Sequence, residues 1–200
     1  MTSGHQSTHK MAPKKQHPKR TGEDRLPGDL PPAALVERMI RVDHAGEYGA
    51  VRIYEGQMAV LGKGPTGTTV QRMADQEREH LEAFDRLVVG RQVRPTALTP
   101  LWHVAGFALG AGTALMGEKA AHACTVAIEE VIDEHYGKQA EQLGDDESDL
   151  RDTIERFRAD EIAHRDEALE HGAREAPCYE VLTSAIKAGS RLAIWLSERI

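Results

Sequence analysis

The chain has 200 residues, enough for one domain with a sizeable core. Its formal net charge of −7 argues against nucleic acid as a partner. Aromatic residues make up only 4% of the chain, and a composition with plentiful Ala and Glu favours helices over sheets.

We expect residues 1–32 to form a disordered, basic N-terminal arm. Residues 1–25 carry six Lys or Arg against two acids, a net +4 within the total of −7, so the rest of the chain carries about −11. The arm has neither the apolar stretch of a secretory signal nor the amphipathic pattern of a mitochondrial transit peptide. We therefore expect one folded domain, residues 33–200, after the arm.

Five long helical patterns follow the arm, separated by short stretches rich in Gly, Pro and Asp. They cover about residues 33–61, 68–89, 101–143, 147–172 and 179–200, and the third is interrupted by glycines. No segment alternates with period two over the length of a strand. The pattern predicts an all-α fold.

The second helical segment carries two ionisable residues where its apolar stripe should run. In steps of three and four, the stripe comprises Val70, Met73, Glu77, His80, Phe84 and Leu87. This rhythm marks the core-facing side of a bundle helix. We therefore expect Glu77 and His80 to be buried and to have partners.

The fourth segment repeats the pattern, with Glu161 and His164 on its stripe. Glu47 lies on the stripe of the first segment, and Glu129 on that of the third. Glu77 follows Glu47 by 30 residues, and Glu161 follows Glu129 by 32. The sequence therefore predicts two tandem hairpins, each with a Glu helix followed by a Glu-x-x-His helix.

Four carboxylates in a core need cations, because desolvation costs several kcal/mol for each ion. Two ferrous ions would neutralise them, and residues three apart on a helix can chelate one metal. Ferritin-like carboxylate proteins use this arrangement. Oxygen ligands with one imidazole per metal suit iron or manganese better than a metal that prefers thiolates. The predicted ligands are Glu47, Glu77, His80, Glu129, Glu161 and His164.

Two further residues are candidates for a role beside the metals. Tyr136 follows Glu129 by seven residues and returns to the same helix face, so it is a candidate relay for protons or electrons. A tyrosine that only packs in the core is the alternative. Asp160, four residues before His164, is a candidate to orient an imidazole, and a solvated helix acid is the alternative.

Residues 96–117 form the one long apolar run, with a length close to that of a membrane span. Pro100 and His103 interrupt its start, and its continuation must deliver Glu129 to the core. A helix that lies in the membrane interface, or one that lines an apolar channel to the metals, fits better than a span. The last helical segment also pairs an apolar face with basic residues, which suits a headgroup surface. Ordinary core packing is the alternative for both segments.

Five strings around the predicted ligands carry a resemblance to a known family: "RVDHAGEYGA", "DQEREHLEAF", "RPTALTPLWHVAGFALGAGTALMG", "ACTVAIEEVIDEHY" and "AIWLSERI". Over roughly residues 36–200 the chain resembles the demethoxyubiquinone hydroxylases of ubiquinone biosynthesis. The resemblance implies a ferritin-like four-helix bundle with additional amphipathic, membrane-associated helices. It also implies a di-iron monooxygenase that uses O2 to hydroxylate the ring of a polyprenylated demethoxyubiquinol.

The resemblance divides the predicted ligands between two irons in chain order: Glu47, Glu77 and His80, then Glu129, Glu161 and His164. Glu77 and Glu161 would bridge the pair. Electrons would come from the reduced quinol or from NADH, and the lack of a glycine-rich dinucleotide fingerprint makes any NADH site unconventional. The family also works with a lipid-binding partner protein, and exposed apolar helix surface invites a homo-oligomer.

Two other functions remain open at this point. One is a ferroxidase or peroxidase of the ferritin or rubrerythrin type, although soluble iron handling has no need of the apolar residues 96–117. The other is a membrane-docked scaffold whose metals are structural. We expect a peripheral protein on the cytoplasmic face of a bacterial inner membrane, or at the mitochondrial inner membrane if the source is a eukaryote.

Overall fold

The computed structural model describes residues 28–200, so the predicted arm lies almost wholly outside the described residues. The described part contains six α-helices and two short 3-10 turns and has no strand, which confirms the expected all-α fold. The elements are α1 (Pro32–Leu61), α2 (Pro65–Gly90), α3 (Thr99–Leu115), α4 (Glu118–Gln142), η2 (Asp145–Glu147), α5 (Ser148–Glu170), η3 (Ala173–Glu175) and α6 (Tyr179–Ser197).

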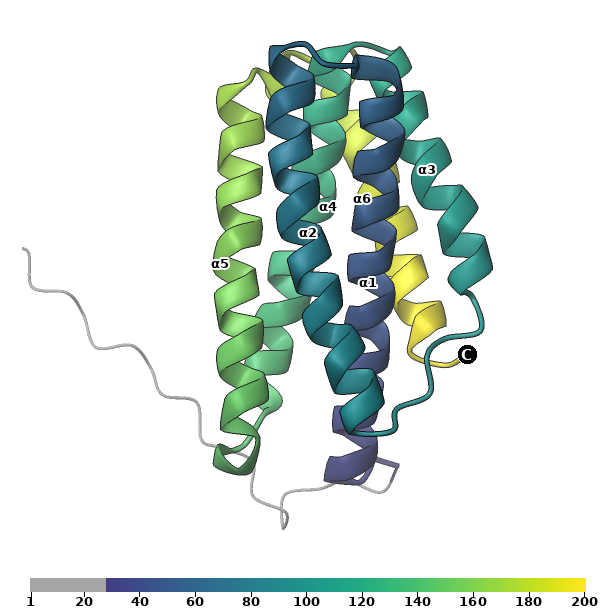
Figure 1. The fold of residues 1–200 in the computed structure, drawn as a ribbon, viewed down its shortest axis with the longest axis vertical. Coiled ribbons are helices and arrows are strands. Elements are labelled where there is room, and N and C mark those ends of the chain that lie inside the picture. The colour runs from purple at the N-terminus through teal and green to yellow at the C-terminus, as the bar shows by residue number, and fades with distance from the viewer. Residues whose placement is uncertain (1–27) are drawn as a thin grey trace, which may run out of the picture.

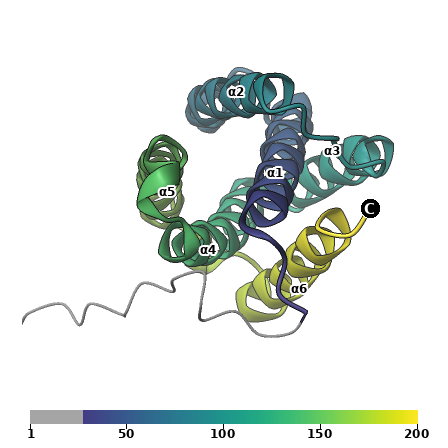
Figure 2. The ribbon, with the colours of Figure 1, turned by 90° about the horizontal axis from the view of Figure 1, so that it is seen from below.

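Helices α1, α2, α4 and α5 form a four-helix bundle (Figure 1). Helix α1 packs on α2, and α4 packs on α5, so the bundle consists of the two predicted hairpins. Helices α3 and α6 lie outside the bundle, where α3 packs on α1 and α6 packs on α4 (Figure 2). One side of the bundle therefore has an extra layer that the other side lacks.

The long third pattern is two helices, α3 and α4, which separate at Met116 and Gly117. Gly117 has a φ of +117°, a backbone conformation that a residue with a Cβ rarely adopts. This glycine lets the chain leave α3 and enter the bundle as α4. The break lies near the glycines of the pattern, as expected, and it raises the number of long helices from five to six within residues 28–200.

Hydrogen bonds also hold α3 and α6 together. The indole Nε1 of Trp102 in α3 donates to Oγ of Ser197 in α6 at 3.1 Å. The hydroxyl of Thr96 donates to the backbone oxygen of Ile200 at 2.7 Å. These contacts fix the start of α3 against the end of α6.

Large apolar side chains on α3 and α6 face solvent. Leu101, Val104 and Leu115 of α3, and Val181, Leu192 and Trp195 of α6, are each at least 50% exposed. None of the helices in residues 28–200 combines the length and the apolarity that a membrane crossing requires.

Helices α1 and α3 approach so closely that glycines separate their backbones. A Cβ at Gly110 of α3 would lie 1.9 Å from the backbone oxygen of Ile53 in α1. A Cβ at Gly56 of α1 would lie 2.2 Å from the backbone oxygen of Phe107 in α3. Only a residue without a Cβ allows this approach at both positions.

We expect Gly110→Ala to destabilise the protein by about 1–3 kcal/mol, because the added methyl group forces α3 away from α1. Gly112→Ala on the same helix is the matched control, since nothing lies within 4 Å of its Cβ position. The control should be neutral or stabilising by up to about 1 kcal/mol. Urea unfolding followed by circular dichroism measures both, and equal stability of the two variants would contradict the expectation.

Candidate metal centre

The structure brings all six predicted ligands together at the centre of the bundle. Each is at most 2% exposed: Glu47 of α1, Glu77 and His80 of α2, Glu129 of α4, and Glu161 and His164 of α5. They form two overlapping groups, and in each group every residue offers one ligand atom that lies within 4.8 Å of those of the others. Each group has three carboxylates and one imidazole, and both groups contain Glu77 and Glu161.

Ordinary helix geometry explains this convergence. On α2, the stripe residues above and below the ligands, Met73 and Phe84, are fully buried. On α5, Phe157 and Ala168 take the equivalent positions, and both are buried. The apolar stripe therefore brings each helix against the bundle axis, and the Glu and His on the same stripe must point there as well.

The atoms that face the centre have no hydrogen-bond partner within the described part of the chain. They are Oε2 of Glu47 and Glu129, both carboxylate oxygens of Glu77 and Glu161, and Nδ1 of His80 and His164. Nδ1 of His164 lies 3.1 Å from Oε1 of Glu77, and Nδ1 of His80 lies 3.2 Å from Oε1 of Glu161. Buried polar atoms are normally hydrogen-bonded, so this set fits cations better than an empty core.

The remaining oxygens of the two unshared glutamates each accept a hydrogen bond from a buried tyrosine. Tyr54 of α1 donates to Oε1 of Glu129 at 2.7 Å, and Tyr136 of α4 donates to Oε1 of Glu47. Each tyrosine follows the glutamate of its own helix by seven residues, yet it bonds the glutamate of the other helix. The two hairpins therefore hold each other's ligands.

Each histidine also contacts a polar side chain of the other hairpin. Nε2 of His80 on α2 lies 3.2 Å from Oδ2 of Asp160 on α5, and Nε2 of His164 on α5 lies 3.1 Å from Oε1 of Gln76 on α2. An acceptor at Nε2 keeps the ring proton there, so the lone pair of Nδ1 is free to bind a metal. Both imidazoles are thus oriented with Nδ1 toward the centre.

Burial dominates the electrostatics of the metal-free cluster. It raises the pKa of Glu77 and Glu129 well above the usual range, and the charge of Glu161 adds to the effect. Burial also raises the pKa of Glu161 itself. Burial lowers the pKa of His80, but the carboxylates of Glu161 and Glu47 outweigh it and bring the value to about 12. Without cations, the cluster therefore keeps protons that exposed groups would release.

Two contacts of the centre were not foreseen from the sequence. Tyr54 was not predicted to have a role, although its spacing from Glu47 equals that of Tyr136 from Glu129. Gln76 precedes Glu77 as Asp160 precedes Glu161, and this parallel position was the available signal.

Asp160 does orient an imidazole, but the ring belongs to His80 of the other hairpin and not to His164 of its own helix.

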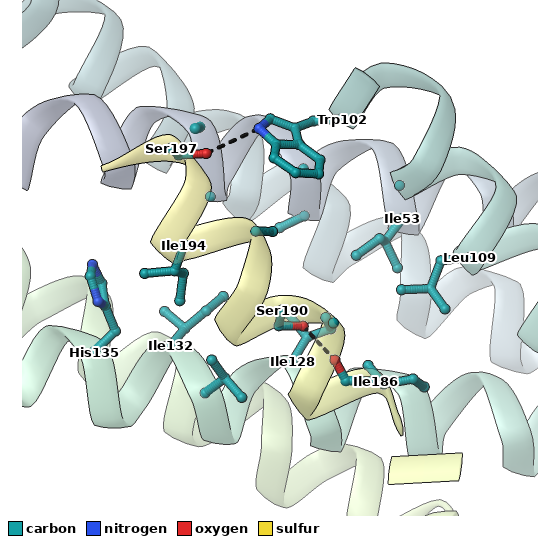
Figure 3. A pocket seen from close by; sticks show the side chains of 18 of the residues that line it. Ile53, Trp102, Leu109, Ile128, Ile132, His135, Ile186, Ser190, Ile194 and Ser197 are labelled. Atoms are coloured by element: carbon teal, nitrogen blue, oxygen red, sulfur yellow. Dashed lines mark hydrogen bonds between the residues drawn. The ribbon is translucent and has the colours of Figure 1, made fainter. Parts of the chain in front are cut away.

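A cavity of about 570 Å³ lies between α1, α3, α4 and α6 (Figure 3). Its wall is mostly apolar, with Ile53, Leu109, Ile128, Ile186 and Ile194 among the side chains that line it. Glu47 is the one predicted ligand that lines it. The cavity therefore lies beside one group of ligands, on the side where α3 and α6 cover the bundle.

A small polar cluster also borders the cavity. Asp43 of α1 is 2% exposed, and its Oδ1 lies 3.1 Å from Nε2 of His135 and accepts a hydrogen bond of 2.8 Å from Gln139. Asp43 and His135 both line the cavity, next to Tyr136. Burial raises the pKa of Asp43, against the opposing effect of His135. The cavity thus pairs a long apolar wall with hydrogen-bonding groups near Glu47.

Comparison with known proteins identifies the family. Residues 34–197 match the family described as "Ubiquinone biosynthesis protein COQ7". The chain belongs to the COQ7 family. This result confirms the resemblance carried by the five strings.

Relatives in the COQ7 family are similar along most of their length. A Rhodospirillum rubrum protein named 3-demethoxyubiquinol 3-hydroxylase is 62% identical over 183 residues, 91% of this chain and 86% of that protein. The human NADPH-dependent 3-demethoxyubiquinone 3-hydroxylase, named mitochondrial, is 55% identical over 171 residues, 84% of this chain and 79% of that protein. The mitochondrial 5-demethoxyubiquinone hydroxylase of Saccharomyces cerevisiae is 43% identical over 185 residues, with shares of 84% and 79%.

The protonation of the centre predicts how the stability of the metal-free protein depends on pH. Folded Glu77, Glu129 and His80 have pKa values raised above those of the unfolded chain. Above about pH 7 the folded state therefore keeps a proton on His80 that the unfolded chain has released, and the free energy of unfolding falls as pH rises, by up to about 1.4 kcal/mol per pH unit. His122, with a pKa lowered to about 4, is neutral in both states there.

We expect the Tm of metal-free protein to fall from about pH 7 to about pH 9. Bound metal displaces the protons, so the metal-loaded protein should lose this dependence. Differential scanning calorimetry of both forms measures the effect. A metal-free Tm that stays constant or rises over this range would contradict the raised pKa values.

Proposed function

We propose that this chain is a di-iron monooxygenase that hydroxylates the ring of demethoxyubiquinol with O2 in ubiquinone biosynthesis. The observation that carries the proposal is the cluster of buried, unpartnered carboxylate and imidazole atoms beside a large apolar cavity. The names of the relatives supply the reaction. When bound, two iron ions would supply the reduction of O2, with one oxygen atom entering the ring and the other leaving as water.

The six ligands would divide as their unpartnered atoms suggest. Glu77 and Glu161 each offer two free oxygens, and a bridging carboxylate needs two. Glu47 and Glu129 each offer one, because a tyrosine takes the other. One ion would therefore be held by Glu47 and His80, the other by Glu129 and His164, and both by the bridging pair. The oxygen-rich donor set suits iron.

The cavity would hold the quinol, with its ring beside Glu47 and its isoprenoid tail between α3 and α6. The apolar wall matches the tail, which is insoluble in water. Asp43 and His135 would hydrogen-bond the ring hydroxyls and fix which carbon faces the metals. A soluble ferroxidase or peroxidase has no need of such a cavity, and this favours the hydroxylase over that alternative.

Tyr136 would act as the relay proposed from the sequence. Its hydroxyl donates to Glu47, and the residue lines the cavity, so it joins the substrate side to a metal ligand. Tyr54 makes the equivalent bond to Glu129 and is not among the residues that line the cavity. This difference supports a relay at Tyr136 and a purely positioning role at Tyr54.

Electrons would come from the reduced quinol or from a reduced nicotinamide. The family resemblance implies NADH, and the name of the human relative specifies NADPH.

The protein would work as a peripheral protein at a membrane. Helices α3 and α6 line the cavity and also carry exposed apolar side chains. Docking of this surface on a membrane would therefore let the tail enter the cavity directly. The same surface could hold a lipid-binding partner or a second copy of the chain. We propose the cytoplasmic face of a bacterial inner membrane, or the mitochondrial inner membrane in a eukaryote, as the human and yeast relatives are named mitochondrial.

A single turnover with labelled oxygen tests the proposed reaction. Fe(II)-loaded protein with short-tailed demethoxyubiquinol should transfer one atom of ¹⁸O₂ to the ring, as measured by mass spectrometry. Glu161→Ala should give no labelled product, because it removes a bridging ligand. Glu155→Ala, an exposed glutamate of the same helix, is the matched control and should keep the activity. Iron oxidation without labelled quinol would instead favour a ferroxidase.

Filling the cavity tests where the substrate binds. Gly189 of α6 lines the cavity, and nothing lies within 4 Å of its Cβ position, so Gly189→Leu should fill space without moving the backbone. We expect kcat/KM for the quinol to fall roughly tenfold or more, as changes of a few methylene groups do in apolar pockets. Gly112→Leu, equally unobstructed and outside the cavity lining, is the control. Equal kcat/KM values would argue against this cavity.

A further inference from the structure

The two candidate metal positions have ligands of the same kinds, but the residues that contact their histidines differ. One position comprises Glu47 and His80, the other Glu129 and His164, and both contain Glu77 and Glu161. The formal charge of the ligands is therefore equal. Each unshared glutamate also accepts a hydrogen bond from a buried tyrosine, so the tyrosines do not distinguish the positions.

The acceptors behind the histidines do differ. The Nε2 atom of His80 donates to a carboxylate oxygen of Asp160, and that of His164 donates to the amide oxygen of Gln76. The two distances, 3.2 and 3.1 Å, are nearly equal, so the chemical difference is the charge of the acceptor. A carboxylate draws the ring proton more strongly than an amide, and it makes Nδ1 a stronger electron donor to a metal.

The rings are also held differently. His80 stacks on Phe157 with a centroid distance of 3.9 Å and an interplanar angle of 26°. His164 makes an edge contact with Tyr54 at a centroid distance of 6.4 Å. The close stack limits rotation of His80, so its Nδ1 loses less freedom when it binds a metal.

We propose that the position of Glu47 and His80 binds a divalent metal ion more tightly than the position of Glu129 and His164, with Asp160 as the positioning residue responsible. This inference rests on the proposed function, because both need the six residues to act as metal ligands. It adds that the tighter position is the one beside the cavity, since Glu47 lines the cavity and Glu129 does not. The ion nearest the substrate would thus be the one that the protein retains.

The experiment measures each position alone, because shared bridging ligands couple the two binding steps. His164→Ala leaves the position of Glu47 and His80 with its imidazole, and His80→Ala leaves the other. The full-length, metal-free variants are titrated with Co²⁺ without oxygen, by calorimetry and by the visible spectrum of the bound ion. We expect His164→Ala to bind Co²⁺ about 10–100-fold more tightly than His80→Ala, the range known for changes in the partners of metal ligands.

Two further substitutions assign the difference to the acceptors. Asp160→Asn added to His164→Ala should remove most of the advantage, because it leaves an amide acceptor like that of Gln76. Gln76→Glu added to His80→Ala should strengthen the weaker position, and it keeps the test open if the Asp160 variant does not fold. Equal affinities of the two single variants would overturn the proposal, as would an Asp160→Asn variant that folds and binds Co²⁺ unchanged.

The outcomes separate this inference from the proposed function. Unequal affinities in a protein that gives no labelled quinol would support the inference and contradict the hydroxylase. Labelled quinol from a protein with equal affinities would do the opposite. Helix content and Tm of each metal-free variant, measured by circular dichroism, confirm that the compared proteins are folded.

Discussion

The burial of four glutamates in an apolar helical core is the constraint on which the rest of the structure depends. An unpaired ionised carboxylate in such a core costs several kcal/mol, so each charge must be neutralised. In the metal-free protein, retained protons serve this purpose, as the raised pKa values of Glu77 and Glu129 indicate. Metal ions can take the place of the protons. Metal affinity and the free energy of unfolding should therefore both depend on pH through the same ligands.

Hydrogen bonds between the two hairpins connect the packing of the bundle with the positions of the ligands. Tyr54 of the first hairpin donates a hydrogen bond to Glu129 of the second, and Tyr136 of the second donates one to Glu47 of the first. A hairpin on its own would leave its tyrosine without a buried acceptor and its glutamate without a donor. The hydrogen bonds form together only when the hairpins dock in one register. The register of the bundle and the geometry of the ligands are therefore set by the same contacts.

The sequence predicted the features that depend on helix periodicity. The stripe positions of Glu77 and His80 required burial, and the repeat in the second hairpin required that the two sites converge. Contacts across the bundle, such as that of Asp160 with His80, join residues 80 positions apart, and no local pattern encodes them. The break at Gly117 depends on a backbone angle, and the cavity depends on how α3 and α6 pack, so neither could be placed from periodicity.

The extra layer of α3 and α6 turns a nearly symmetric bundle into an asymmetric one. Both helices cover the same side (Figure 2), and a cavity forms beside Glu47, whereas Glu129 is not among the residues that line it. Helix α1 makes room for it with Gly46 and Gly49, whose Cβ positions are unobstructed. Elsewhere on the same helix, Gly56 lets α3 approach to backbone contact. Helix α3 thus contacts the backbone of α1 at Gly110 and bonds to α6 through Trp102 and Ser197, and residues of all three helices line the cavity.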